Sequence, residues 1–381
     1  MKRFTSVILI SVCLSATYAQ SYISNTMQYD NESREYDIYV PATYDGTTPV
    51  PLIFNFHGGN GDIASQIAIS DMSPIADTAT VIVVYPQALP DPNDGGSTNW
   101  IHKDPTTVDD VFFIDALIDT LSEAYNIDQS KMYACGYSLG GEFTYELSCR
   151  LNRRIAAIGV VARTMQTWTL SECSPVHKTG VLTILGTADF ISNYNGVWWG
   201  GIQYYLSADE VHEYWGSYNS CDTIPDVSQI PNTDPLDGST VERYVWSDSN
   251  NCSYVEHLKV IEGGHDWPGS FGNMDINATQ EIWNFVSRYD TSGLVGCTTT
   301  AIEANHSDTF YSVYPNPFTN RLTIEVNLPN NKEFNIYSML GELLLKGRLN
   351  ADLVTIDVSA FPPNMYILNI DNQSIKVLKM K

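Results

Sequence analysis

Short apolar segments with strand character alternate with segments of helical periodicity between residues 36 and 289. Several of these apolar segments lack a polar residue at every second position, which is typical of strands buried on both faces. Such alternation predicts a mostly parallel sheet with helices on both faces. The expected strands are 36–40, 52–56, 81–85, 132–135, 155–161, 181–185 and 258–261.

Helical periodicity is clear in three places. Apolar residues recur at spacings of three and four over 111–121 and again over 282–289, which gives each segment one apolar helix face. Ser207 and Glu210 have the spacing of a capping box ahead of the apolar positions in 211–218. We expect this third helix to lie in an insertion between the last two strands.

The end of the chain has a different character. A chain of 381 residues is long enough for one large domain and one small one. Residues 298–307 are polar and lack periodicity, so we expect a linker there. The segment 308–381 predicts a small all-β sandwich of about 70 residues. Its short alternating runs are 322–326, 334–337, 343–345, 354–358 and 366–370.

The beginning of the chain predicts export. A basic start at Lys2 and Arg3, an apolar run over 7–14 and small residues before position 20 are the three parts of a secretory signal peptide. We expect residues 1–19 to be removed after Ala19. No other apolar stretch approaches the length of a membrane span, so we expect an extracellular protein without one.

Acidic residues are concentrated in the larger domain. Residues 20–307 contain 11 basic and 37 acidic residues, a net charge of −26, whereas 308–381 contain seven of each. A body this negative repels polyanions, which argues against nucleic acid or an anionic membrane as a partner and favours a neutral substrate. The alternative interpretation, that the acidity only serves solubility outside the cell, excludes nothing.

The segment 136–140 reads Gly-Tyr-Ser-Leu-Gly and stands between an expected strand and a helical pattern. In a nucleophile elbow, a serine occupies a sharp strand-to-helix turn, and its flanking glycines let the backbone approach closely. A match to this short pattern arises by chance in about one chain of this length in ten. The strand-to-helix context therefore decides in favour of Ser138 as a nucleophile.

A serine nucleophile needs a base, and an acid is expected between the two in chain order. Asp189 follows the expected strand 181–185, and His265 follows 258–261. Either residue alone is more simply read as part of an ordinary loop, but three residue types in this order at three strand ends form a rarer pattern. The sequence predicts an α/β-hydrolase fold for 20–297, with Ser138, Asp189 and His265 as a catalytic triad.

Backbone N–H groups that stabilise the oxyanion are expected in two places. One is Leu139, directly after the nucleophile, and the other is the loop with Gly58 and Gly59, which follows the strand 52–56. We expect His57 to pack against this loop or to orient it. The remaining histidines show no metal-ligand spacing, so the mechanism is expected to need neither a metal nor another cofactor.

Further motifs accompany these residues in the segment 35–289. They include Tyr85-Pro86, Trp100, Val108-Asp109-Asp110-Val111, Gly186-Thr187-Ala188-Asp189, Trp215 ahead of Cys221, and Gly264-His265 followed by Trp267-Pro268-Gly269. With the elbow, they resemble the secreted esterases related to polyhydroxybutyrate depolymerases and to the feruloyl and acetyl xylan esterases of carbohydrate esterase family one. The resemblance implies the same three catalytic residues.

Substrate preference is less constrained. The resemblance implies hydrolysis of feruloyl or acetyl esters on plant polysaccharide, with polyhydroxybutyrate as an alternative polyester substrate and a non-catalytic surface binding protein as an alternative of another class. Leu185 stands where many relatives have a histidine before Gly-Thr-x-Asp, so the substrate preference of those relatives need not transfer to this chain. Trp100, Trp198, Trp199 and Trp267 lie near the catalytic segments, and we expect them to stack against the substrate.

The last segment resembles the sorting domain of the type IX secretion system, because of Tyr314-Pro315-Asn316-Pro317-Phe318, Ile336-Tyr337, Leu340-Gly341 and a lysine-rich end. The resemblance implies the secretion machinery as a partner. A carbohydrate-binding sandwich is the alternative.

Six cysteines remain after the signal peptide, and an exported protein tends to oxidise them. Six cysteines allow 15 connectivities. The family resemblance and the positions of Cys221 and Cys252 imply a bond between these two. The partners of the other four stay open, with Cys149 and Cys173 as one candidate pair.

Overall fold

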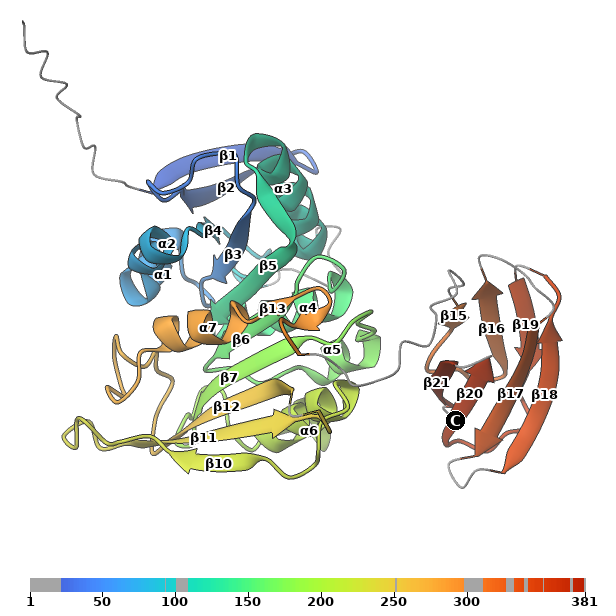
Figure 1. Ribbon diagram of the computed structural model, residues 1–381. Helices are drawn as coiled ribbons and strands as arrows, with labels where there is room; N and C mark the ends of the chain where they lie inside the picture. Colours follow the sequence, from blue (N-terminus) through green and yellow to red (C-terminus); the bar gives the residue numbers. More distant parts are fainter. Residues whose placement is uncertain are drawn as a thin grey trace, which may run out of the picture. The chain divides into compact units, whose positions relative to one another are not determined.

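A ten-stranded sheet organises the first of two compact units, Met1–Thr299 and Thr300–Lys381, into which contacts divide the chain (Figure 1). The computed structural model describes residues 22–92, 94–100, 109–250, 252–297, 311–326, 332–338, 342–351, 353–370 and 373–379. The expected signal peptide at 1–19 and the expected linker at 298–307 lie outside these residues.

The sheet is parallel in its centre and antiparallel at both edges. Its strand order is β1-β2-β4-β3-β5-β6-β7-β12-β11-β10, and the six strands from β4 to β12 run parallel. This arrangement confirms the predicted α/β-hydrolase fold class. The bounds are β1 Ile23–Tyr29, β2 Glu32–Tyr39, β3 Val50–Phe56, β4 Ile82–Pro86, β5 Ile127–Tyr137, β6 Ala157–Val161, β7 Gly180–Gly186, β10 Asp226–Gln229, β11 Thr240–Ser247 and β12 Ser253–Ile261.

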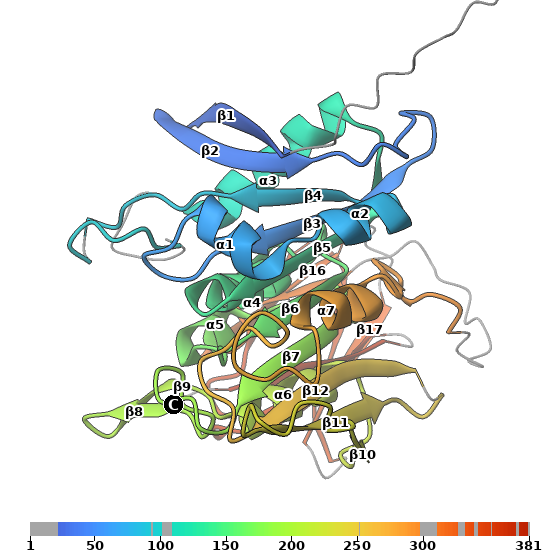
Figure 2. The ribbon, with the colours of Figure 1, turned by 90° about the vertical axis from the view of Figure 1, so that its left-hand side faces the viewer.

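Helices cover both faces of this sheet (Figure 2). Side chains of α3, α4 and α6 pack in one apolar cluster, and those of α1, α2 and α7 pack in another on the opposite face. The strands between them are buried on both sides, so successive residues such as Ile53 and Phe54 enter different clusters. The bounds are α1 Ile63–Ser70, α2 Ser73–Ala79, α3 Asp110–Ala124, α4 Leu139–Arg150, α5 Thr167–Glu172, α6 Ala208–Tyr218 and α7 Ala278–Val286.

The helix that starts after Ser207 shows how local signals set an element. The Ser207 hydroxyl accepts from the backbone N–H of Glu210 at 3.2 Å, and the Glu210 carboxylate accepts from that of Ser207 at 2.7 Å. Two N–H groups that lack partners inside the helix are thereby satisfied. The predicted capping box, and with it the start of α6, is confirmed.

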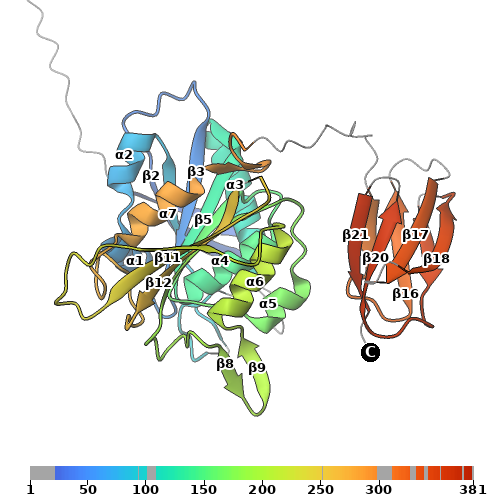
Figure 3. The same ribbon diagram turned by 60° about the horizontal axis from the view of Figure 1, so that its bottom comes forward.

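A two-stranded hairpin, β8 (Val197–Trp199) and β9 (Ile202–Tyr205), projects from the first unit (Figure 3). Gly200 and Gly201 form its two-residue turn with φ of +60° and +81°, a conformation that favours glycine. A second short hairpin, β13 (Tyr289–Asp290) and β14 (Gly293–Leu294), follows α7. Neither hairpin was expected from the sequence.

The second unit is a sandwich of two antiparallel sheets, as predicted. One has the order β15-β16-β19 and the other β18-β17-β20-β21, with Leu322, Ile324, Ile336 and Leu368 in the shared core. The bounds are β15 Tyr311–Tyr314, β16 Arg321–Val326, β17 Lys332–Ser338, β18 Leu343–Leu349, β19 Leu353–Asp357, β20 Met365–Ile370 and β21 Gln373–Leu378.

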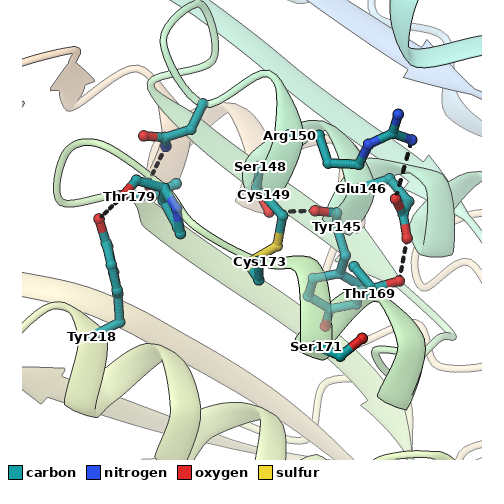
Figure 4. The surroundings of a disulfide bond; sticks show 12 residues. Tyr145, Glu146, Ser148, Cys149, Arg150, Thr169, Ser171, Cys173, Thr179 and Tyr218 are labelled. Atoms are coloured by element: carbon teal, nitrogen blue, oxygen red, sulfur yellow. Dashed lines mark hydrogen bonds and ion pairs between the residues drawn. A yellow bond between two sulfur atoms is a disulfide. The ribbon is translucent and has the colours of Figure 1, made fainter. Parts of the chain in front are cut away.

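One disulfide joins Cys149 on α4 to Cys173 directly after α5, and this candidate pair is confirmed (Figure 4). The Thr169 hydroxyl donates to the Glu146 carboxylate beside the bond. Bond and hydrogen bond together hold the short helix α5 against α4.

The expected bond between Cys221 and Cys252 is wrong, because Cys252 pairs with Cys297 and Cys221 is a free thiol. The β13–β14 hairpin explains this pairing. It leads the chain back to Tyr254 beside Cys252, and the Cα atoms of the bonded pair lie 6.0 Å apart. Cys221 instead forms a β-bridge with Asp248. Burial raises the pKa of its thiol to about 11.

Replacing Cys149 and Cys173 together by alanine is expected to lower the free energy of unfolding by about 3.5 kcal/mol, because the bond closes a loop with a sequence separation of 24. Urea denaturation measures the loss. Cys221→Ala is the matched control and should change stability little. Peptide mapping that recovers Cys221 joined to Cys252 would contradict the Cys252–Cys297 bond and the free thiol of Cys221.

Candidate active site

Ser138 occupies the turn between β5 and α4 with φ of +51° and ψ of −120°, a conformation that L-residues rarely adopt. The turn is possible because glycines stand two residues before and two residues after the serine. A Cβ on Gly136 would overlap the backbone of Gly140, and one on Gly140 would overlap the carbonyl oxygens of Phe56 and His57. The sharp turn lifts the serine hydroxyl away from the end of the strand.

Asp189 and His265 lie in loops at the ends of two adjacent parallel strands, β7 and β12. Backbone hydrogen bonds tie these loops together, from the N–H of Thr187 to the carbonyl of Val260 and from that of Ala188 to Gly263, both at 2.9 Å. These bonds therefore fix the two loops relative to each other and to the sheet.

The structure brings all three predicted residues together. His265 Nδ1 lies 2.7 Å from Asp189 Oδ2, and its Nε2 lies 2.9 Å from Ser138 Oγ. The other oxygen of the buried Asp189 carboxylate accepts from the N–H groups of Ile191 and Ser192, each at 2.8 Å. With Nδ1–H donating to the carboxylate, Nε2 is free to accept the proton of the serine hydroxyl.

The expected glycine loop lies beside this turn. A Cβ on Gly58 would be 3.3 Å from that of Ser138, and one on Gly59 would meet the side chain of Leu139. Leu139 is the first residue of α4, and the first N–H groups of a helix have no partner inside it. These backbone groups thus border the space next to the serine.

His57 orients this loop, as predicted. Its Nδ1 lies 2.7 Å from the carbonyl of Gly58, and its Nε2 accepts from the backbone N–H of Ala88 at 3.1 Å. Burial lowers the pKa of the imidazole, which keeps it neutral in this hydrogen-bonding role.

Two of the four tryptophans expected to contact substrate belong to the core. Trp100 is 6% exposed, stacks on Phe143 and donates to the carbonyl of His57, so it supports the glycine loop from behind. Trp267 is 1% exposed and donates to Thr279. Indole rings are the largest apolar side chains, and here their burial outweighs any use on the surface. Trp198 and Trp199, in contrast, are 62% and 77% exposed.

The structure contains a buried polar cluster beside α4 that was not predicted from the sequence. Glu142, in the first turn of the helix, accepts from Arg163 at 2.6 Å and from the Tyr205 hydroxyl at 2.9 Å. The guanidinium also lies over the Tyr205 ring, 4.0 Å from its centroid. Burial opposes the charge of Arg163, but Glu142 outweighs it and raises the pKa of the guanidinium. The sequence gives no signal for the cluster, because its members lie far apart in the chain.

Tyr137 was also missed, although it stands inside the elbow motif. Its hydroxyl donates to the carbonyl of His265 at 2.6 Å, and the two rings lie 5.1 Å apart. The residue before the serine therefore holds the loop of the histidine.

A buried chain of hydrogen bonds lies beneath the acid and base loops. It runs from the Tyr194 hydroxyl to His257 Nε2 at 2.9 Å, from His257 Nδ1 to the Thr183 hydroxyl at 2.8 Å, and from there to His212 Nε2 at 2.8 Å. Burial lowers the pKa of His212 to about 3 and that of His257 well below its usual value. Both imidazoles are thus held neutral.

Two further kinds of site can be assessed in the described part of the chain. There, no cluster of three or more His, Cys, Asp or Glu side chains is arranged to hold a metal ion. Within the same ranges, no helix has both the length and the apolar character needed to cross a bilayer.

Residues 312–380 match the family model described as a secretion system C-terminal sorting domain. The match coincides with the β-sandwich unit and confirms the resemblance predicted for this segment. The predicted extracellular location is confirmed with it.

Curated relatives match part of the chain. The chain is 26% identical over 274 residues to a bifunctional acetylxylan esterase/xylanase of Neocallimastix patriciarum, covering 72% of this chain and 36% of that protein. It is 31% identical over 134 residues to a probable feruloyl esterase C of Aspergillus niger, covering 34% and 46%. The chain thus spans less than half the length of these two relatives.

A feruloyl esterase C of Emericella nidulans is 25% identical over 238 residues, covering 61% of this chain and 76% of that protein. Among solved structures, an acetyl xylan esterase from Aspergillus awamori matches with a TM-score of 0.49 and 14% identity, covering 70% of this chain and 99% of the other. The three curated relatives confirm the predicted resemblance to acetyl xylan and feruloyl esterases.

Gly140→Ala is expected to destabilise the protein by about 1–3 kcal/mol or more, because the new methyl group overlaps two backbone carbonyls. Gly216→Ala, inside α6, is the matched control. Its Cβ would meet no atom within 4 Å, and the change should raise stability by about 0.5–1 kcal/mol. Thermal and urea unfolding of the two variants test the difference, and equal effects would contradict it.

The two neutral histidines predict a pH dependence of stability. Their pKa values are lowered in the folded state, so their contribution is complete above the unfolded pKa of about 6.5 and is lost as the pH falls towards 3. His212→Gln keeps a hydrogen-bonding group near Nε2 and removes one titrating site. It should reduce the slope of unfolding free energy against pH by up to about 1.4 kcal/mol per pH unit between pH 6 and 4. Urea unfolding at several pH values measures this slope. The same slope of unfolding free energy against pH in both proteins would count against a neutral, buried His212.

Proposed function

We propose that this protein is a secreted serine carboxylic-ester hydrolase that acts on feruloyl or acetyl esters of plant cell-wall polysaccharide. The observation that carries the proposal is the hydrogen-bonded chain from Ser138 through His265 to Asp189. Its serine stands on a strained strand-to-helix turn, and its carboxylate is buried and oriented by two backbone N–H groups. This combination suits nucleophilic attack on a carbonyl carbon.

The chemistry follows from the positions of these groups. Ser138 Oγ attacks the ester carbonyl while His265 Nε2 takes the hydroxyl proton, and Asp189 stabilises the imidazolium that forms. The tetrahedral intermediate collapses to an acyl-enzyme, and the imidazolium returns the proton to the leaving alcohol. Water then attacks the acyl group with the same base, which releases the carboxylic acid and regenerates the serine.

The negative oxygen of the tetrahedral intermediate needs donors that are already in place. We assign this role to the backbone N–H of Leu139 and to the loop of Gly58 and Gly59. The helix dipole of α4 adds a partial positive charge at Leu139. His57 and Trp100 fix the glycine loop from behind, which spares the site a costly reorganisation during the reaction.

The choice of substrate is supported by the relatives, whose names specify acetylxylan and feruloyl esterases. A first unit with a strongly negative charge also suits neutral polysaccharide better than a polyanion. A polyester such as polyhydroxybutyrate is neutral as well and stays the second candidate. The exposed aromatic side chains of the β8–β9 hairpin would suit either polymer.

Ser138→Ala is expected to lower the turnover of 4-nitrophenyl acetate by about 10⁴-fold or more, because the members of a triad act as one unit. Asp189→Asn should cost somewhat less. Ser270→Ala, an exposed serine in the loop after His265, is the matched control and should keep wild-type turnover. A folded Ser138→Ala protein with activity within about tenfold of wild type would end the proposed mechanism.

Parallel assays on methyl ferulate, acetylated xylan and amorphous polyhydroxybutyrate identify the substrate class. Release of ferulate or acetate that depends on Ser138 supports the proposal. Release of hydroxybutyrate alone would replace polysaccharide esters by a polyester and leave the triad intact. No turnover of any ester, including the aryl acetate, would favour a non-catalytic binding protein.

A further inference from the structure

The β8–β9 hairpin carries an unusual number of exposed apolar side chains. Trp199 is 77% exposed, Ile202 62% and Tyr204 43%. Soluble proteins rarely leave several large apolar side chains uncovered in one place unless the surface binds something. The hairpin is therefore a candidate binding surface.

The register of the hairpin places these three side chains on one face. Trp199 pairs with Ile202, and Tyr204 stands two residues after Ile202 in β9, so all three share a face, whereas Trp198 and its partner Gln203 fall on the opposite one. The Trp199 and Tyr204 rings lie 6.4 Å apart. We call the face formed by Trp199, Ile202 and Tyr204 the aromatic face.

α5 borders the hairpin beside Tyr204. The Thr167 hydroxyl donates to the carbonyl of Gln203 at 3.1 Å, which places this helix against β9. The next residue, Trp168, is 45% exposed. A further exposed indole therefore belongs to the helix that contacts β9.

The root of the hairpin is fixed to the helix that begins at the candidate nucleophile. Tyr205, the last residue of β9, donates to Glu142 and packs against Arg163. Glu142 is in the first turn of α4, four residues after Ser138. The aromatic face is thus carried by a rigid support that is continuous with the candidate active site.

We propose that the aromatic face binds the polysaccharide backbone of the substrate, a chain of neutral pyranose rings, while the ester group reacts at Ser138. This proposal rests on the proposed function and names the part of the substrate that the hairpin holds. The C–H faces of a pyranose ring are flat and weakly positive, so they stack on the negative faces of indole and phenol rings. A second copy of this chain fits less well, because residues 20–307 carry a net charge of −26 and repel one another.

The test separates polymer binding from catalysis by using the Ser138→Ala protein. In native gels that contain soluble arabinoxylan, this protein should be retarded. Adding Trp199→Ala and Tyr204→Ala should raise the Kd by about tenfold, since two stacking surfaces are removed. Phe112→Ala, which removes an aromatic side chain 55% exposed on α3, is the matched control and should leave the retardation unchanged.

The same double substitution in the active protein provides a second readout. Its kcat/KM on methyl ferulate should stay within about twofold of wild type, whereas its KM on feruloylated arabinoxylan should rise with kcat unchanged. Because both side chains are exposed, we expect the double substitution to leave the melting temperature unaltered. An unaltered melting temperature shows that the fold is retained.

Several results would overturn the proposal. One is that arabinoxylan does not retard the Ser138→Ala protein. Another is that this protein binds amorphous polyhydroxybutyrate but not arabinoxylan. A third is that light scattering shows a dimer that the double substitution dissociates. Retardation by arabinoxylan together with an inactive wild-type protein would refute the proposed function while supporting the binding face.

Discussion

The close approach of α4 to the end of β3 is the constraint on which the candidate site depends. Gly140 touches the backbone of Phe56 and His57, so the helix starts closer to the sheet than any side chain would allow. This contact goes together with the positive φ of Ser138 and with the position of the first N–H groups of α4 beside the glycine loop at Gly58. A single packing distance thus sets both the serine and the donors proposed to face it.

The other half of the site depends on the pairing of β7 with β12. Each strand contributes one buried residue to the hydrogen-bonded chain of Thr183 and His257, and each ends in a loop that supplies one partner of the Asp189–His265 contact. Gly186 permits the close contact between these loops, because a Cβ there would overlap the backbone of Gly263. The acid and the base are therefore positioned by strand register and not by the loops alone.

The sequence was sufficient to predict the parallel centre of the sheet, α6 with its capping box, and the three residues that meet at Ser138. These features have local signals in apolar periodicity, caps and glycine spacing. The edge strands β10 and β11 were missed because their residues are largely polar or partly exposed. Trp100 and Trp267 were misassigned because an indole near a catalytic segment looks the same in sequence whether it is buried or exposed. The Cys252–Cys297 bond depends on a short hairpin with no recognisable signal.

That bond has a consequence for the maturation of an exported protein. Cys297 lies at the end of the described part of the first unit and is covalently joined to the residue just before β12. Proteolytic cleavage between Cys297 and Tyr311 would remove the sorting domain but leave the new carboxyl-terminal segment covalently joined to the central sheet. The start of the strand that leads to His265 would then be held in place. The first unit would therefore stay folded after the sorting domain is lost.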